Sequence, residues 1–336
     1  MIDLPQPRGA VTERLLHALR AGPGPVGPAG DPDEEDLQLA LYLCYELHYR
    51  GLPGVDDRWE WEPSLLALRR ELERRFEHEL RHAVPAPAGD GAIDMCLREI
   101  ADADSGPSLS RHLEREGTLE QFLEFAVHRS AYQLKEADPH SWALPRLSGP
   151  PKAALVEIQA DEYGGGDPVR IHAALFARAM DALGLDSRYG AYLDHLPAVT
   201  LATVNLMSMF GLHRRLRGAI VGHLALFEMT SSIPNRRYAS GLRRLGLDDP
   251  AATRFFDEHV EADSVHENIA AYDLAGGLAR QEPELAGDII FGARCLLYTE
   301  ARFIDHILDA WERGEGSLLA APAAGATEPA LAQSAV

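Results

Sequence analysis

The stretch FFDEHVEADSVHENIA (residues 255–270) places His259, Asp263 and His266 four and three positions apart, in a segment without Gly or Pro. In an α-helix these three side chains fall within an arc of about 60° and span about 10 Å of the helix axis. Imidazole and carboxylate groups together are ligands for iron, manganese or zinc. An exposed polar face of an acidic helix explains the same spacing, so metal binding and a solvated face both remain open at this point.

Helical periodicity extends over most of the chain on both sides of this segment. Apolar residues recur three and four positions apart in residues 35–50, and residues 64–82 have the pattern of a strongly charged helix. A further long helix is expected over residues 197–229. No stretch shows the sustained alternation of β-branched residues that is typical of strands. The sequence therefore predicts an all-α fold.

Proline and its neighbours indicate where some of these helices begin and end. In GGGDPVRIH (residues 164–172), Asp167 is expected as the N-cap of a helix whose first residue is Pro168. Ser232 and Pro234 are expected to interrupt the helix that contains Glu228.

Composition divides the 336 residues into three parts. Residues 1–34 are expected to form a short amphipathic helix and a flexible linker rich in Pro and Gly. Residues 35–313 carry the helical patterns and are expected to form the main domain. Residues 314–336 have little apolar surface to pack and are expected to be disordered.

Charge and hydropathy exclude several classes of partner. The formal net charge of −20 argues against a nucleic-acid or anionic-membrane partner. His, Arg or Glu interrupts the longest apolar stretches, and the N-terminus lacks the pattern of a secretory signal, so a cytoplasmic protein is expected. The three cysteines, Cys44, Cys96 and Cys295, are far apart and odd in number, which is typical of free thiols in a reducing compartment.

A metal site needs ligands beyond one helix, and an isolated carboxylate offers one. Glu228 lies in the apolar run HLALFEM (residues 223–229), where a charge is costly unless it is paired or bound to a metal. An ion pair with Arg236 or Arg237 is the alternative explanation, and these two arginines could instead bind a substrate carboxylate. Further candidate ligands precede Glu228 in the chain. They are Glu157, Asp161, Glu162 and His172.

The order of these residues resembles a known superfamily. Glu-x9-His, then an isolated Glu, then His-x3-Asp-x2-His is similar to the haem-oxygenase-like diiron oxidases. The segments YELHYRG (45–51), QLKEADPH (133–140), DEYGGG (161–166), EMTSSIPNRRY (228–238) and EHVEADSVHE (258–267) resemble the actinobacterial iron-containing redox enzymes of that superfamily. The resemblance covers residues 36–313 and implies a haem-oxygenase-like core of seven helices with additional N-terminal helices, often assembled as a homodimer.

The resemblance also implies the site and its chemistry. Its metal ligands would be Glu162, His172, Glu228, His259, Asp263 and His266. Relatives that oxygenate nitrogen have one more carboxylate ligand upstream, a place that Glu136 matches, although a surface pair with Lys135 explains Glu136 equally well. Two Fe²⁺ ions per chain would activate O₂ through a peroxo-diiron intermediate to oxidise a small amine- or carboxylate-bearing metabolite, with N-oxygenation among the outcomes. Glu162, Glu228 and Asp263 would offset three of the four positive charges.

Other functions remain as alternatives. A metal-free helical hydrolase on the same scaffold would use Cys295 as its nucleophile, and a mononuclear iron protein would use fewer of the ligands. A ferritin-like bundle needs Glu-x-x-His on two helices, and only Glu79 and His82 fit that spacing. A non-catalytic interaction protein would leave Glu228 and the His259–His266 stripe unexplained.

Overall fold

The computed structural model describes residues 4–84, 92–103 and 105–319; within helix α12 the side chains of residues 261–265 are not described. The described residues form helices and contain no strand, which confirms the all-α prediction. The helices are α1 (Ala10–Ala21), α2 (Glu34–Glu46), α3 (Pro63–Ala83), α4 (Ile93–Ala103), α5 (Leu109–Arg115), α6 (Leu119–Gln133), α7 (Asp138–Ser141), α8 (Gly149–Glu162), α9 (His172–Ala182), α10 (Ala198–Leu212), α11 (Arg217–Arg244), α12 (Pro250–Asn268), α13 (Gly277–Gln281) and α14 (Ala286–Glu312). Short 3₁₀ turns are Asp57–Trp61, Leu144–Arg146, Gly164–Gly166, Leu193–His195, Arg214–Leu216 and Pro283–Leu285, and a π-helix, Ile269–Gly276, follows α12.

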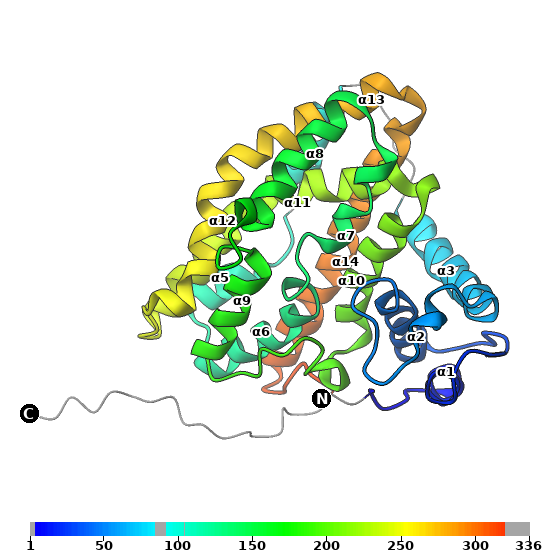
Figure 1. Ribbon diagram of the computed structural model, residues 1–336. Helices are drawn as coiled ribbons and strands as arrows, with labels where there is room; N and C mark the ends of the chain where they lie inside the picture. Colours follow the sequence, from blue (N-terminus) through cyan, green and yellow to red (C-terminus); the bar gives the residue numbers. More distant parts are fainter. Residues whose placement is uncertain (1–3, 85–91, 104, 320–336) are drawn as a thin grey trace, which may run out of the picture.

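Helix α11 is the centre of the bundle (Figure 1). It packs most extensively against α14 and α12, and it also contacts α5. Helix α12 packs in turn against α9, and α8 packs against the π-helix that continues α12. Helices α11 and α12, which carry Glu228 and the His259–His266 stripe, therefore pack directly against each other.

Two glycines allow α11 and α14 to approach each other closely. A Cβ atom on Gly222 of α11 would lie 1.8 Å from the carbonyl oxygen of Ile289 in α14. A Cβ atom on Gly292 of α14 would lie 1.9 Å from the carbonyl oxygen of Ala219 in α11. Because the obstacle in both cases is backbone, which cannot rotate away, any larger residue would force the two helices apart.

The N-terminal helix packs on the main body. Leu15 and Leu16 of α1 belong to the same apolar core as helices α2 and α3, and the Asp36 carboxylate accepts hydrogen bonds from the backbone amides of Val11 and Thr12 at 2.9 and 2.8 Å. At the other end, the Ser317 hydroxyl lies 2.9 Å from Nε2 of buried His128. Residues 320–336 of the expected tail lie outside the described residues. The division of the chain at residues 34 and 313 stays a prediction.

The long helix expected over residues 197–229 is wrong in its boundaries. The segment divides into α10 and α11, because His213 adopts an extended backbone conformation with ψ 114°. The guanidinium of Arg146 donates to the carbonyl oxygens of Gly211 and Leu212, which satisfies the last carbonyls of α10. A distant side chain therefore ends this helix.

The interruption expected at Ser232 and Pro234 is also wrong, since α11 continues through both residues. Pro234 removes the backbone hydrogen bond to the carbonyl of Thr230 and crowds that carbonyl, so the helix continues here at a local cost. Beyond the proline, Ala239 and Leu242 are buried, so tertiary packing holds the helix on both sides.

The start expected for α9 is wrong as well. The Asp167 carboxylate accepts a hydrogen bond from the backbone amide of Val169 in a turn, and the helix begins only at His172. The three preceding glycines, Gly164, Gly165 and Gly166, have positive φ angles of 69°, 62° and 88°. This tight connection turns the chain from the end of α8 to the start of α9, and it brings Glu162 close to His172.

None of the described helices is long and apolar enough to cross a membrane. Cys44 and Cys295 are buried free thiols, and Cys96 is a half-buried free thiol, as the sequence predicted.

Candidate metal centre

The structure brings six of the candidate ligands together, whereas Glu157 is exposed on α8 and lies in neither group. The six residues come from the α6–α7 turn (Glu136), the end of α8 (Glu162), the start of α9 (His172), the middle of α11 (Glu228) and helix α12 (His259 and His266). Each is buried, with exposed fractions between 1% and 7%. Asp263 lies on α12 between the two histidines, and its side chain is outside the described residues.

The candidate ligands form two groups that share one carboxylate. In the first group, one oxygen or nitrogen atom from each of Glu136, Glu162, His172 and His259 lies within 4.8 Å of the others. In the second group, the same holds for Glu162, Glu228 and His266. Glu162 belongs to both groups, and a carboxylate has two oxygens that can bind two different ions.

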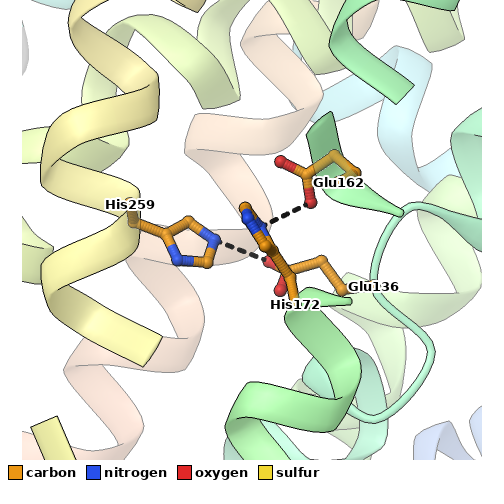
Figure 2. A group of neighbouring side chains, drawn as sticks. All are labelled: Glu136, Glu162, His172 and His259. Carbon is orange, nitrogen blue, oxygen red and sulfur yellow. Dashed lines mark ion pairs between the residues drawn. The ribbon is translucent and has the colours of Figure 1, made fainter. Parts of the chain in front are cut away.

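The first group lies between α12 on one side and the α8–α9 connection on the other (Figure 2). Nδ1 of His172 is 3.0 Å from Oε2 of Glu162, and Nε2 of His259 is 3.3 Å from Oε1 of Glu136. The two imidazole rings lie with their centroids 4.4 Å apart. Two carboxylates and two imidazoles thus converge on one point from four different segments of the chain.

The second group places His266 between two acidic residues. Its Nδ1 is 3.5 Å from Oε2 of Glu228, and its Nε2 donates a hydrogen bond to Oδ2 of Asp161 at 2.9 Å. Because His259 and His266 are seven residues apart on α12, they lie about 10 Å apart along the axis and serve different groups. The stripe on α12 therefore spans both groups.

Each of the two imidazoles on α12 makes a hydrogen bond with one ring nitrogen, and this bond determines which nitrogen faces the site. Nδ1 of His259 donates to the carbonyl oxygen of Phe255 at 2.8 Å, so Nε2 is the nitrogen that faces Glu136. The Asp161 carboxylate holds the proton of His266 on Nε2, so Nδ1 faces Glu228. A carbonyl or carboxylate on the far nitrogen is the usual partner of a metal-binding histidine.

Several donor atoms have room for a partner that is not a protein group. Within the described part of the chain, Nδ1 of His172, Nδ1 of His266 and Oε2 of Glu136 are buried and make no well-formed hydrogen bond. A cavity of about 10 Å³, about the size of one water molecule, lies among residues that include Glu136, Glu162 and Glu228. Buried polar atoms are rarely left unsatisfied, so this donor set fits a bound cation.

In the metal-free protein, protonated histidines supply the positive charge of this site. Burial lowers the pKa of His266, but the Glu228 and Asp161 carboxylates outweigh burial and raise that pKa to about 9. Burial also lowers the pKa of His172, but the neighbouring Glu162 carboxylate outweighs burial. The pKa of His172 therefore lies above its usual value. Burial would raise the pKa of Glu162, but His172, His259 and His266 lower it to about 2. The carboxylates thus select positive charge at this site.

Contacts of the residues before and after Glu136 fix the turn that carries it. Ala137 has a φ of 72°, the one positive φ among the described non-glycine residues, and its carbonyl oxygen accepts a hydrogen bond from Nε2 of Gln159 at 2.9 Å. Lys135, which the sequence left as a possible surface partner of Glu136, is buried instead and pairs with Glu46. The Glu46 carboxylate also accepts a hydrogen bond from the Tyr189 hydroxyl at 2.5 Å. Glu136 is therefore positioned by its neighbours and is not a surface residue.

Sequence reasoning missed the residues that orient the ligands. Asp161 is a candidate ligand by sequence, but its carboxylate contacts Nε2 of His266, the nitrogen that faces away from Glu228. Gln159 was not considered, although it precedes Glu162 by three residues and so lies on the same face of α8. Phe227, beside Glu228, lines the small cavity and had no signal other than its position in an apolar run.

Comparison with known proteins identifies the family of this chain. The sequence model for iron-containing redox enzymes matches residues 123–301, a segment that includes all of the ligands named above. The chain is also 29% identical over 137 residues to a nitrosourea synthase of Streptomyces achromogenes subsp. streptozoticus, a match that covers 41% of this chain and 29% of that protein. The chain thus spans less than a third of this relative. Because the family match covers more than half of the 336 residues, the chain belongs to the iron-containing redox enzyme family, as its sequence resemblance implied.

Proposed function

We propose that the protein is a non-haem diiron oxidase that uses O₂ to oxidise a small amine- or carboxylate-bearing metabolite. The observation that carries the proposal is the shared position of Glu162 in two adjoining groups of buried ligands. One ion would be held by Glu136, Glu162, His172 and His259, and the other by Glu162, Glu228 and His266. The family resemblance adds Asp263 to these ligands. Two ferrous ions held there would supply electrons and a binding place for O₂.

The residues of the chain have defined tasks around such a centre. The Phe255 carbonyl and the Asp161 carboxylate orient His259 and His266. Phe227 and Leu224 line the small cavity and exclude water from it. Gln159 holds the α6–α7 turn in the conformation that presents Glu136.

The alternatives have less support. A mononuclear centre would leave one of the two ligand groups, including buried Glu228, without a role. A hydrolase with a Cys295 nucleophile requires a thiolate, but burial raises the pKa of the Cys295 thiol well above its usual value. The similarity to a nitrosourea synthase favours oxidation of a nitrogen atom, and the presence of Glu136 in the first ligand group agrees with that outcome. Assembly as a homodimer stays a prediction of the family resemblance.

An anaerobic ferrous titration tests the proposal. We expect binding to saturate near two equivalents per chain, because two ligand groups are present. Glu162→Ala should weaken both sites, and His266→Ala should weaken one, as measured by metal analysis and Mössbauer spectroscopy. His82→Ala is the matched control, because His82 is exposed on α3 and belongs to neither group. Saturation at one equivalent would establish a mononuclear site, and retention of zinc without iron uptake would exclude the oxidase.

A further inference from the structure

A large cavity adjoins the candidate metal centre. It has a volume of about 950 Å³ and is lined by residues of α4, α5, α6, α9, α11, α12 and α14 and of the loop before α5. Phe227 lines both this cavity and the small one among the ligands. Phe255, also in the wall, packs its ring 4.4 Å from the ring of His259. The volume is in the range of sites that hold small organic molecules.

Much of the cavity lining is apolar. Its aromatic and aliphatic lining includes Phe125, Phe176, Phe227, Phe255, Phe256 and Leu296. Such a wall binds the hydrocarbon or aromatic body of a ligand and offers nothing to a charged group. A charged group on the ligand must therefore find its partner elsewhere in the cavity.

Two half-buried arginines, Arg129 and Arg237, also line the cavity, and only Arg129 makes a bidentate pair with a carboxylate. The guanidinium of Arg129 makes a bidentate pair with Glu300 at 2.9 and 2.7 Å. The guanidinium of Arg237, 25% exposed, has its nearest described carboxylate, that of Glu114, 3.9 Å away. A carboxylate normally meets this fork in two short parallel hydrogen bonds.

The other contacts of Arg237 are neutral and long. Its Nη1 donates to the hydroxyls of Ser108 and Ser110 at 3.3 and 3.4 Å, and both serines line the same cavity. The two hydroxyls can turn their protons toward an incoming anion. The carboxylate of Glu114, 3.9 Å from Nε of Arg237, keeps the surroundings from being strongly positive, which favours a monoanion over a dianion.

We propose that Arg237, with the hydroxyls of Ser108 and Ser110, binds the carboxylate of a substrate whose apolar body lies against the phenylalanine wall. The site thus selects monocarboxylic acids with a hydrocarbon or aromatic chain. The anchor belongs to α11, the same helix that carries Glu228, so the carboxylate is bound away from the ligands while the chain extends toward them. This inference rests on the proposed function, since it assigns the cavity to the substrate of that centre.

The neighbouring arginine provides a matched control. Arg236 precedes Arg237 on α11, yet it is exposed and lines a different surface pocket. Removing the charge of either residue changes the net charge of the protein equally. Only the loss of Arg237 should affect a ligand in the cavity.

Calorimetry on the iron-loaded, anaerobic protein tests the anchor. The probes are phenyl-terminated carboxylic acids of increasing chain length and the matching neutral amides. We expect the parent to bind acids of suitable length at least about tenfold more tightly than their amides, as the loss of one charge-assisted pair predicts. Arg237→Gln should abolish this preference, Arg237→Lys should retain part of it, and Arg236→Gln should keep all of it.

The outcomes separate the two proposals. Equal affinity for acid and amide, an unchanged preference in Arg237→Gln and Arg237→Lys, or no binding of any probe to the parent would overturn the anchor. Thermal unfolding of each variant shows whether it is folded, and the lysine variant keeps the test valid if the glutamine variant is not. Failure of the chain to take up iron would overturn the proposed function instead, because acid binding can also be measured in the metal-free protein.

Discussion

At the scale of single residues, the ligands depend on partners that are not ligands themselves. Asp161 is adjacent to Glu162 in sequence, but its side chain contacts the far nitrogen of His266. Its side chain is 62% exposed, whereas that of His266 is 1% exposed. An exposed carboxylate therefore orients a buried imidazole and, together with Glu228, raises its pKa.

The charge of His266 predicts how metal binding depends on pH. The pKa of about 9 lies above the ordinary value, so the proton is bound at neutral pH and a metal ion must displace it. Apparent affinity for Fe²⁺ should therefore rise as pH increases from about 6 to about 8, with proton release on binding. The same raised pKa stabilises the metal-free fold below about pH 6.5, and this contribution is lost as pH rises through about 9. Anaerobic titration in a weakly buffered indicator solution measures the release.

The Asp161→Asn variant is the informative comparison. It removes one of the carboxylates that raise the pKa of His266, so proton competition should diminish and the pH dependence should become shallower. Glu157→Gln, an exposed change on the same helix, should behave as the parent does. An identical pH dependence in Asp161→Asn would show that Asp161 does not control this proton.

At the scale of helices, the contact between α11 and α14 depends on Gly222 and Gly292. Gly222→Ala should lower the free energy of unfolding by at least about 1–3 kcal/mol, because the added methyl group would overlap the Ile289 carbonyl. The cost should exceed the gain in helix propensity, which is about 1 kcal/mol for Gly to Ala. Chemical denaturation followed by circular dichroism measures the change.

Gly287 provides the control for this effect on α14 itself. A Cβ atom at Gly287 would meet nothing within 4 Å, so Gly287→Ala should be neutral or slightly stabilising. Similar destabilisation by both substitutions would mean that the close approach of α11 and α14 is not the cause. Since Glu228 follows Gly222 by less than two turns of α11, loosening this contact should also weaken iron binding.

At the scale of the whole molecule, the candidate site connects elements from distant parts of the chain. Its ligands lie on α8, α9, α11 and α12 and in the α6–α7 turn, so bound iron would tie these five segments together. Removing iron should lower the unfolding temperature. The free energy of unfolding should fall by about 2.7 kcal/mol if the free iron concentration had been a hundredfold above Kd. Anaerobic thermal unfolding with and without a chelator measures the loss. The Glu162→Ala variant should show a much smaller difference, and an equal difference would place the stabilising iron elsewhere.

Much of this architecture could be predicted before the structure was known. The fold class follows from apolar residues three and four positions apart, since helical periodicity is a local property. Glu228 could be proposed as a ligand because a charge is costly in an apolar run unless something binds it, and the full ligand set was implied by the resemblance to a known family. His259 and His266 are two turns apart on one helix, so their common face is determined by local geometry alone.

Only the tertiary structure decided where helices end and which ligands meet. Arg146 ends α10 from sixty-five residues away, and packing carries α11 through Pro234 against the local preference. The division of the ligands into two groups around Glu162 depends on how five segments pack, as does the burial of Lys135 against Glu46. Hydrogen bonds within a helix connect near neighbours, so a sequence determines them directly. Contacts between helices depend on how all the helices pack together, and that packing was not visible in any single stretch.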